Sequence, residues 1–471
     1  MDLPLTSLLF LVISIGAGIS SALHALLSKR DSKSALAWVI FCLLIPIAGP
    51  LMYLLFGINR IKEAAQREFH PQSIEAESET IPEPLAERFR PLSLVGGKVT
   101  DWGIKSIEEI TPLENGEAFY PSLCKDIEAS QSTIYLSTYI FRNDEIGQHI
   151  TDKLEAARDR GVDVRIIIDA LGELVYPPRI GRQLRKRGFK FRRFNPIHLI
   201  PPSLRINMRN HRKIIVIDNA VAYTGGQNLS QRHMVTGQLE RRSAQDLHFR
   251  LTGKIVADLQ RAFVIDWNHC CKGRDRLTPS PYEAGGGPTT TWGRIVLDGP
   301  NENLDELNEV LLGAFSSARS RIWIMTPYFL PGFDLVGALV GARLRGVDVK
   351  ILIPERTNIY FAHWATQHNL KFILGRGLEV FLQPSPFVHT KAIIIDDFYS
   401  LIGSANLDAR SLRLNFEIGV EVFSFDFNNE IAAYFARMKQ RCKPADESVL
   451  ERRSWPVKLR DAIAWLFSPY L

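Results

Sequence analysis

Cysteine is scarce in this 471-residue sequence, and the spacing of its five cysteines fits neither a disulfide framework nor a zinc site. No block of one charge sign stands out, because 57 lysines and arginines offset 51 acidic residues to leave a net charge of +6 spread along the chain. No cluster of metal-binding carboxylates is evident either. We therefore expect no metal and no cofactor, and the mild positive charge favours an anionic partner, whether lipid or nucleic acid.

Charged residues are almost absent from two stretches near the N-terminus, Leu8 to Leu27 and Ala35 to Phe56. Each has about the 20 residues that a helix needs to cross a bilayer. A cleaved signal peptide is the alternative for the first stretch, but Asp2 replaces the usual basic residues and no small-x-small cleavage site follows. The pattern predicts a membrane anchor over residues 1–58 with a pair of transmembrane helices.

The second apolar stretch contains Pro46, Gly49 and Pro50, so a kinked helix or one that re-enters the same leaflet stays possible. Basic residues are nearly balanced between the loop before this stretch and the segment after it. The side of the membrane that carries the rest of the chain is therefore left open by the positive-inside rule.

Two stretches of biased composition divide the remaining chain. Residues 59–100 are polar and predict a linker, and residues 276–291 are rich in glycine and proline and predict a second one. Two lobes then cover residues 101–275 and 292–445, followed by a C-terminal amphipathic tail over residues 446–471. The tail either lies in a lipid interface or packs on its own lobe.

The two lobes are weak copies of each other. GVDVRIIID from Gly161 parallels GVDVKILIP from Gly346, and NHRKIIVID from Asn210 parallels VHTKAIIID from Val388. The offsets between copies drift, as they do when loops differ over a shared core. Because strand-like runs alternate with helical stretches, the fold class predicted is α/β, with two pseudo-symmetric lobes that are each a sheet covered by helices.

Each lobe contains the pattern H-x-K-x4-D, with an asparagine seventeen residues after the histidine. One copy would be a weak signal, but two at corresponding places of a repeat are a strong one. In a strand, residues two apart face the same side, so each histidine and lysine can meet one ligand. The candidate catalytic residues are His211, Lys213 and Asp218 in the first lobe, and His389, Lys391 and Asp396 in the second.

A phosphodiester suits two such sets. One imidazole can attack phosphorus while the other protonates the leaving alkoxide, and the lysines neutralise the oxygens. Asn228, Asn406 and Ser404 are the candidate phosphate-binding residues. Asp218 and Asp396 lie too far along their strands to touch the same phosphate, which favours a turn or inter-lobe role within the motif.

The paired motifs resemble those of the phospholipase D superfamily, and the apolar leader together with the two lobes is similar to bacterial cardiolipin synthases over nearly the whole chain. The resemblance implies transfer of a phosphatidyl group from one phosphatidylglycerol to the hydroxyl of another, with release of glycerol and a phosphohistidine intermediate. By analogy His211 is the nucleophile and His389 the acid and base, although the pseudo-symmetry also permits the reverse.

The same resemblance implies carboxylates that orient the histidines. Glu417, 28 residues after His389, matches the spacing of the superfamily's orienting glutamate. In the first lobe that spacing is displaced, and Asp246 is the better candidate. The expected location is the bacterial inner membrane, multi-pass, with the lobes on the cytoplasmic face, and the expected partners are phosphatidylglycerol and cardiolipin rather than nucleic acid.

Three alternatives share these motifs. A phospholipase D-type hydrolase, or a transferase with another acceptor, would use the same residues on the same lipid. A membrane-tethered nuclease would cleave DNA or RNA with strong salt dependence. A non-catalytic lipid-binding protein would not need both motifs intact.

Overall fold

The structure is a computed structural model that describes residues 5–29, 31–57, 90–197, 207–236, 243–271, 273, 275–282, 289–301 and 303–468. Most of the first predicted linker (59–89) and part of the second (283–288) lie outside these ranges, as do residues 1–4, 58 and 469–471. The chain divides into two compact units, Met1–Glu68 and Phe69–Leu471.

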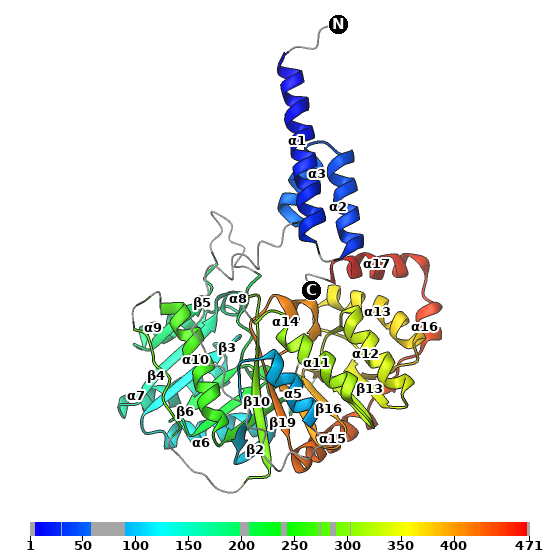
Figure 1. Cartoon of the computed structure of the whole chain (residues 1–471). Coiled ribbons are helices and arrows are strands. Elements are labelled where there is room, and N and C mark those ends of the chain that lie inside the picture. Colours follow the sequence, from blue (N-terminus) through cyan, green and yellow to red (C-terminus); the bar gives the residue numbers. More distant parts are fainter. Residues whose placement is uncertain are drawn as a thin grey trace. The chain divides into compact units, whose positions relative to one another are not determined.

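The first unit is one long helix followed by shorter ones (blue in Figure 1). Helix α1 (Leu5–Ser28) packs against α2 (Ser32–Leu44), and α3 (Ala48–Met52) and the π-helix η1 (Tyr53–Gly57) follow. The second apolar stretch is thus not one helix, as a transmembrane pair would require. Helix α2 stops because Ile45, which precedes Pro46, is held in an extended conformation (φ −116°, ψ 90°).

None of the helices among the described residues combines the length and apolar character needed for a membrane crossing.

The first lobe of the second unit is built on a mixed seven-stranded sheet. Strands β3, β4 and β5 are parallel, and the others pair antiparallel. The order across the sheet is β2 (Glu109–Glu114), β9 (Leu247–Thr252), β7 (Val221–Gly225), β6 (Ile214–Ile217), β3 (Thr133–Thr138), β4 (Asp163–Asp169) and β5 (Lys190–Phe194). Strand β6, with four buried apolar residues, lies near the middle of the sheet, as expected for a fully covered strand.

The second lobe repeats this order in a nine-stranded sheet, of which β13, β16 and β19 are labelled in Figure 1. Its equivalent strands are β10 (Thr291–Asp298), β19 (Glu417–Phe423), β17 (Tyr399–Gly403), β16 (Ala392–Ile395), β11 (Arg321–Met325), β13 (Asp348–Pro354) and β14 (Glu379–Gln383). Two short edge strands, β1 (Lys105–Ile107) and β20 (Lys443–Pro444), are added. The internal repeat found in the sequence therefore corresponds to a repeated strand order.

Helices cover the sheets. In the first lobe these include α6 (Asn115–Ala129), α7 (Glu145–Asp159) and α10 (Ile255–Cys271), and in the second α11 (Glu306–Ser317), α12 (Phe333–Leu344), α13 (Tyr360–Gly375) and α15 (Phe425–Gln440). Helix α7 begins where the side chain of Asp144 accepts a hydrogen bond from the Gly147 amide, and it buries Ile150 and Leu154 on one side. Each lobe has its own apolar core.

Residues 90–99, which fall in the first predicted linker, form helix α5 (Arg90–Val99). Leu92 is buried in the core of the second lobe, and Arg294 donates a hydrogen bond to the Ser93 carbonyl at 2.6 Å. The polar composition of the longer stretch 59–100 hid this short helix, which is attached by Leu92 in the core, by Val99 against it and by Val95 against Gly313. Strand β1, which follows, pairs with β10 and so also belongs to the second sheet.

The C-terminal tail forms α16 (Glu447–Glu451) and α17 (Trp455–Leu466). Helix α17 packs on α13, where the rings of Trp465 and His368 lie 5.0 Å apart. Its other side leaves large apolar side chains exposed, namely Trp455, Leu459, Ile463, Leu466 and the adjoining Phe467. Of the two roles that the sequence allows for the tail, packing on its own lobe is observed, and the exposed stripe leaves the other open as well.

Candidate active site

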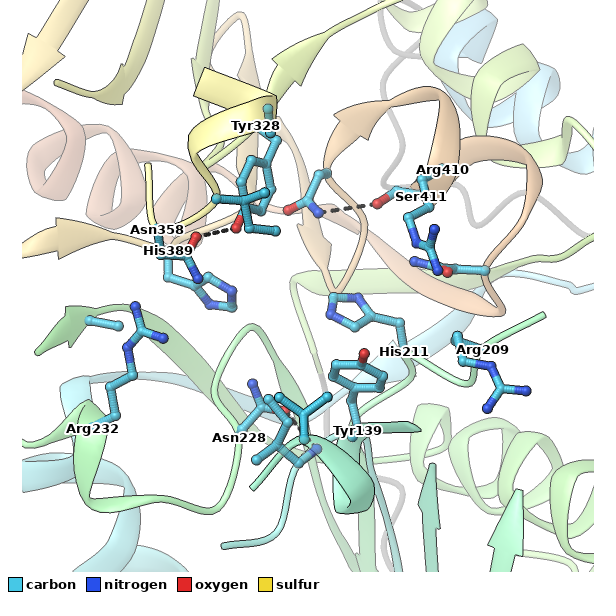
Figure 2. Close-up of a pocket in the computed structure, with 18 of the residues that line it drawn as sticks. Tyr139, Arg209, His211, Asn228, Arg232, Tyr328, Asn358, His389, Arg410 and Ser411 are labelled. Atoms are coloured by element: carbon cyan, nitrogen blue, oxygen red, sulfur yellow. Dashed lines mark hydrogen bonds between the residues drawn. The ribbon is translucent and has the colours of Figure 1, made fainter. Parts of the chain in front are cut away.

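A pocket of about 520 Å³ lies where the two lobes meet, and the histidines of both motifs line it. Figure 2 shows the rings of His211 and His389 facing each other across this space. Arg232 lies on the side of His389, and Arg209 and Arg410 lie on the side of His211. The structure thus brings two motifs that are far apart in sequence into one site.

Short backbone pairings between the lobes position each histidine. The amide of His211 donates to the carbonyl of Phe416 at 2.8 Å, and the amide of His389 donates to the carbonyl of Gln245 at 2.7 Å. Next to His389, strand β15 (Phe387–Val388) pairs with β8 (Ala244–Gln245). In both cases the accepting carbonyl belongs to the residue just before a carboxylate, so each histidine is fixed beside the acid of the opposite lobe.

The carboxylates are consequently crossed between the lobes. Nδ1 of His211 lies 2.9 Å from Oε2 of Glu417, and Nδ1 of His389 lies 2.6 Å from Oδ2 of Asp246. Both predicted carboxylates reach a histidine, and each reaches the histidine of the opposite lobe. Spacing along the chain locates the two acids but does not register this pairing between lobes.

Burial lowers the pKa of His211 below its usual value and that of His389 well below it, so both imidazoles are neutral at pH 7. Each Nδ1 then carries the proton that it donates to its carboxylate, which leaves the lone pair on Nε2. Burial alone would raise the pKa of Glu417, but His211 and Lys213 hold it below its usual value. Burial raises the pKa of Asp246, and Lys391 opposes that rise.

Lys213 and Lys391 are almost fully buried next to the main chain of the histidines. Nζ of Lys213 donates to the carbonyl of His211 at 2.7 Å, and Nζ of Lys391 to that of His389 at 2.5 Å. Burial lowers the pKa of Lys213 to about 7 and that of Lys391 to about 8. A phosphodiester anion in the pocket would oppose both shifts and hold the lysines charged.

Asn228 and Asn406 line the pocket on opposite lobes. Oδ1 of Asn228 accepts from the Ile140 amide at 3.1 Å, and its backbone amide donates to Nε2 of His233 at 3.1 Å. Nδ2 of Asn406 donates to Oγ of Ser411 at 3.1 Å, while its buried Oδ1 has no hydrogen-bond partner among the described residues. If the side-chain amide of Asn406 were rotated by about 180°, Ser411 would donate to Oδ1, and Nδ2 would be free for a ligand.

Ser404 does not have the phosphate-binding place expected of it. It is fully buried, and its hydroxyl donates to Oε2 of Glu417. Asn415 also donates to this carboxylate, from Nδ2 to Oε1 at 3.1 Å. Gly226 is the counterpart of Ser404 in the first lobe, and a Cβ there would come within 2.3 Å of Asp246. Ser404 therefore supports Glu417, and Asp246 has no equivalent hydroxyl.

Asp218 and Asp396, the third letters of the two motifs, do not belong to the catalytic set. The Asp218 carboxylate accepts from the amides of Ser132 and Thr133, each at 2.8 Å, and Asp396 accepts from the amide of Ser320 at 2.7 Å. Both residues have a φ of 52°, in the left-handed region that aspartate tolerates in turns. They hold a turn within their own lobe, and their place in the motif is structural.

Several residues of the pocket wall were missed from the sequence, chiefly Arg142, Arg209, Arg232, Arg410 and His233. Arg209 could have been predicted from the sequence, because it lies two residues before His211 and therefore faces the same side of an extended chain as His211 and Lys213. His233 accepts at Nε2 from Asn228 and faces the Ala244 carbonyl at Nδ1, and burial lowers its pKa to about 3. It is therefore a neutral support for the asparagine.

Across the described ranges, no group of three or more histidine, cysteine or acidic side chains is placed to hold a metal ion. The residues present supply two neutral imidazoles and two asparagine amides around one space, with two buried lysines hydrogen-bonded to the main chain of the histidines. That arrangement suits attack on a phosphodiester by one ring and proton transfer by the other.

Comparison with known protein families agrees with this geometry. The family model described as the PLD-like domain of cardiolipin synthase matches residues 123–267 and 311–439, which include both motifs. A second model, described as phospholipase D-nuclease N-terminal, matches residues 17–57.

Full-length relatives are found among bacterial enzymes. The major cardiolipin synthase ClsA of Bacillus subtilis (strain 168) is 29% identical over 459 residues, covering 94% of this chain and 95% of the relative. The cardiolipin synthase of Geobacillus thermodenitrificans (strain NG80-2) is 31% identical over 466 residues, covering 94% and 90%. The crystal structure of phosphatidylserine synthase from Haemophilus influenzae Rd KW20 shares the fold, with a TM-score of 0.61 at 18% identity over 79% of this chain and 97% of that one.

Proposed function

Because the chain belongs to the family of cardiolipin synthases with phospholipase D-like domains, we propose that it transfers the phosphatidyl group of one phosphatidylglycerol to a hydroxyl of a second, giving cardiolipin and glycerol. The observation that carries this proposal is the pair of neutral imidazoles in one pocket, each bonded to its own carboxylate. The histidines, lysines and asparagines of the two motifs are the residues assigned to the chemistry.

In the first step Nε2 of His211 attacks the phosphorus in line. The bond from phosphorus to the glycerol oxygen breaks, and this oxygen takes a proton from His389. The negative charge of the bound phosphate favours protonation of His389, so substrate binding is coupled to proton uptake. Lys213 and Lys391 stabilise the charge that develops on the phosphate oxygens.

In the second step His389, now neutral, accepts the proton of the incoming hydroxyl. The oxygen of that phosphatidylglycerol attacks phosphorus, and the bond from phosphorus to Nε2 of His211 breaks. This leaves His211 neutral and His389 protonated, as both stood with the donor bound before the first step, and splits one displacement into two.

The choice of His211 as nucleophile has support in the asymmetry of the carboxylates. The nitrogen that bonds phosphorus leaves its ring positively charged, so the partner acid must be ionised. Glu417 receives hydrogen bonds from Ser404 and Asn415 and has a lowered pKa, whereas burial raises the pKa of Asp246. The better-stabilised carboxylate therefore faces His211.

Product analysis tests the proposed reaction. Purified protein in phosphatidylglycerol vesicles is expected to form cardiolipin and glycerol in equal amounts, measured by mass spectrometry of the lipids and of the released alcohol. Phosphatidic acid in place of cardiolipin would identify a hydrolase. Inert lipid together with salt-sensitive cleavage of DNA or RNA would identify a nuclease.

We further propose that residues 1–58 anchor the chain in the bacterial inner membrane. Helix α1 exposes Leu9, Phe10 and Ile13, which are 61%, 62% and 62% accessible. An apolar surface of this kind is unfavourable in water and suits lipid. Because α2 ends at Leu44, we infer that the second apolar stretch enters the bilayer as a broken segment rather than as a full crossing.

The exposed stripe of α17 suits a second contact with the bilayer. Leu459, Ile463 and Leu466 recur at helical spacing, and Lys458 and Arg460 flank them. Apolar residues beside basic ones are the pattern of a helix that lies in an anionic lipid interface.

Vesicle binding tests this second contact. A chain without residues 1–58 is expected to sediment with phosphatidylglycerol vesicles, and changing Leu459 and Ile463 to asparagine is expected to weaken binding at least about tenfold, since both side chains lose apolar contact. Leu344→Asn, a change of another exposed leucine, on α12, is the control and should not alter binding. Failure of the truncated chain to bind vesicles would contradict a role of α17 in lipid contact.

A further inference from the structure

The pocket wall holds four arginines, and Arg232 differs from the others in its partners. Arg142 lies 3.9 Å from Asp144, Arg209 lies 3.4 Å from Asp169, and Arg410 interacts with neighbouring residues. Arg232 has no carboxylate partner within the described part of the chain, and its Nε is buried without a hydrogen bond. A guanidinium in this situation is suited to an anion that comes from outside the protein.

The main chain and one ring hold Arg232 in place. Its backbone amide donates to Oγ of Ser230 at 3.2 Å, within the short turn η3 (Gln231–His233). Its guanidinium lies over the ring of Phe387, with Cζ 5.8 Å from the ring centre. Phe387 comes from the other lobe, two residues before His389, and the rings of Phe387 and His389 are 5.9 Å apart. Arg232 is thereby kept on the His389 side of the pocket (Figure 2).

The proposed reaction requires a second anion on this side. The donor phosphate lies between the histidines, where Lys213 and Lys391 balance its charge. The acceptor presents its hydroxyl to His389, and its own phosphodiester must then remain close to the donor phosphate. Two like charges repel each other strongly in a pocket of low dielectric unless a cation accompanies the second one.

We propose that Arg232 binds the phosphodiester of the acceptor lipid and so selects an anionic glycerophospholipid as the second substrate. This inference rests on the proposed function, since it concerns the second substrate of the same reaction. The planar guanidinium can bond two phosphate oxygens at once, which fixes the acceptor's direction as well as its charge. The headgroup hydroxyl then points to His389.

An acceptor without a phosphate separates this role from a role in the chemistry. Exchange of labelled glycerol into phosphatidylglycerol uses the same donor, the same histidines and the same covalent intermediate, but its acceptor carries no charge. In Arg232→Gln the ratio of cardiolipin formation to glycerol exchange is expected to fall about 10- to 100-fold, the range for losing one hydrogen bond between charged groups. Arg232→Lys keeps the positive charge but cannot form two parallel hydrogen bonds to the phosphate, so it is expected to give an intermediate ratio.

Arg376→Gln is the matched control. Arg376 is also an arginine over a phenylalanine ring, with Cζ 4.8 Å from the centre of Phe372, but it is exposed at the end of α13 and away from the pocket. In Arg376→Gln the ratio of cardiolipin formation to glycerol exchange is expected to equal that of the parent chain. Glycerol exchange itself reports that each variant is folded.

Two results would overturn the proposal. If both reactions of Arg232→Gln fell together, Arg232 would serve the donor phosphate or the fold. If the ratio stayed unchanged, the acceptor phosphate would bind elsewhere. Failure of the proposed function is a separate outcome, because the parent chain would then form no cardiolipin at all.

Discussion

Replacing His211 with alanine is expected to lower cardiolipin formation by at least about 10⁴-fold, because the attacking nitrogen of the covalent step is removed. The side chain lines a pocket and contributes little to either core, so the thermal unfolding temperature should change by only a few degrees. The rate of product formation in vesicles and the unfolding curve of the same preparation are the measurements.

His389→Ala is the informative partner of this variant. With phosphatidylglycerol its rate of cardiolipin formation should be about 10²- to 10⁴-fold lower than that of the parent chain, which is the usual contribution of a general acid and base. With a phosphatidyl ester of p-nitrophenol, whose anion leaves without a proton, it should still release a burst of p-nitrophenol. His211→Ala should release none, and a burst from that variant would contradict the assignment of the nucleophile.

Changing Glu417 or Asp246 to its amide is expected to lower the rate of cardiolipin formation about 10²- to 10⁴-fold. Each acid fixes the tautomer of one histidine and stabilises the cation of that histidine. The crossed pairing makes the two losses distinguishable. Glu417→Gln should slow the burst with the p-nitrophenyl lipid, because Glu417 acts on His211. Asp246→Asn should leave that burst fast and slow the later turnover, because Asp246 acts on His389. The opposite pattern would contradict the pairing.

The pH dependence of the burst gives a second test of Glu417. Burial places the pKa of His211 below its usual value, so the burst rate should fall only at pH values below the usual histidine pKa of about 6.5. The carboxylate raises the pKa of this histidine, so Glu417→Gln should move the acid limb to still lower pH. Glu421→Gln is the control, since this buried acid of the same strand pairs with Arg294 and should affect stability without moving the limb.

Much of the fold of the second unit could be predicted from the internal repeat of the sequence. Two copies of GVDV followed by apolar residues, and two motifs at corresponding places, indicate one α/β design used twice, and the shared strand order agrees with it. The superfamily suggested by the motifs, and its cardiolipin synthase branch, are confirmed by relatives that match nearly the full length of the chain.

The pairing of each histidine with the carboxylate of the opposite lobe could not be predicted from a single sequence. The pairing of His211 with Glu417 depends on the main-chain contact between His211 and Phe416, which joins residues 205 positions apart. Spacing within one repeat contains no information about such a contact. Ser404 illustrates the same limit, because the sequence suggested a phosphate-binding role but its partner, Glu417, is set by the pairing of β19 with β17.

The arginines of the pocket wall were hidden for a related reason. Arg232 lies in the short turn η3 after Asn228, and its contact with Phe387 joins the two lobes, so no pattern within one lobe reveals it. In the second apolar stretch Pro46 indicates a break but not its form. The structure ends α2 just before this proline and divides the stretch into short helices.

Identification of the phosphatidylated residue tests the central claim most directly. His389→Ala is mixed with the p-nitrophenyl lipid, quenched during the burst and digested under alkaline conditions that preserve phosphohistidine, and the peptides are sequenced by mass spectrometry. Two opposed rings acting on one phosphorus predict the lipid adduct on His211 and its loss when a neutral imidazole is added as base. An adduct on another residue, or a burst with no adduct on the protein, would contradict it.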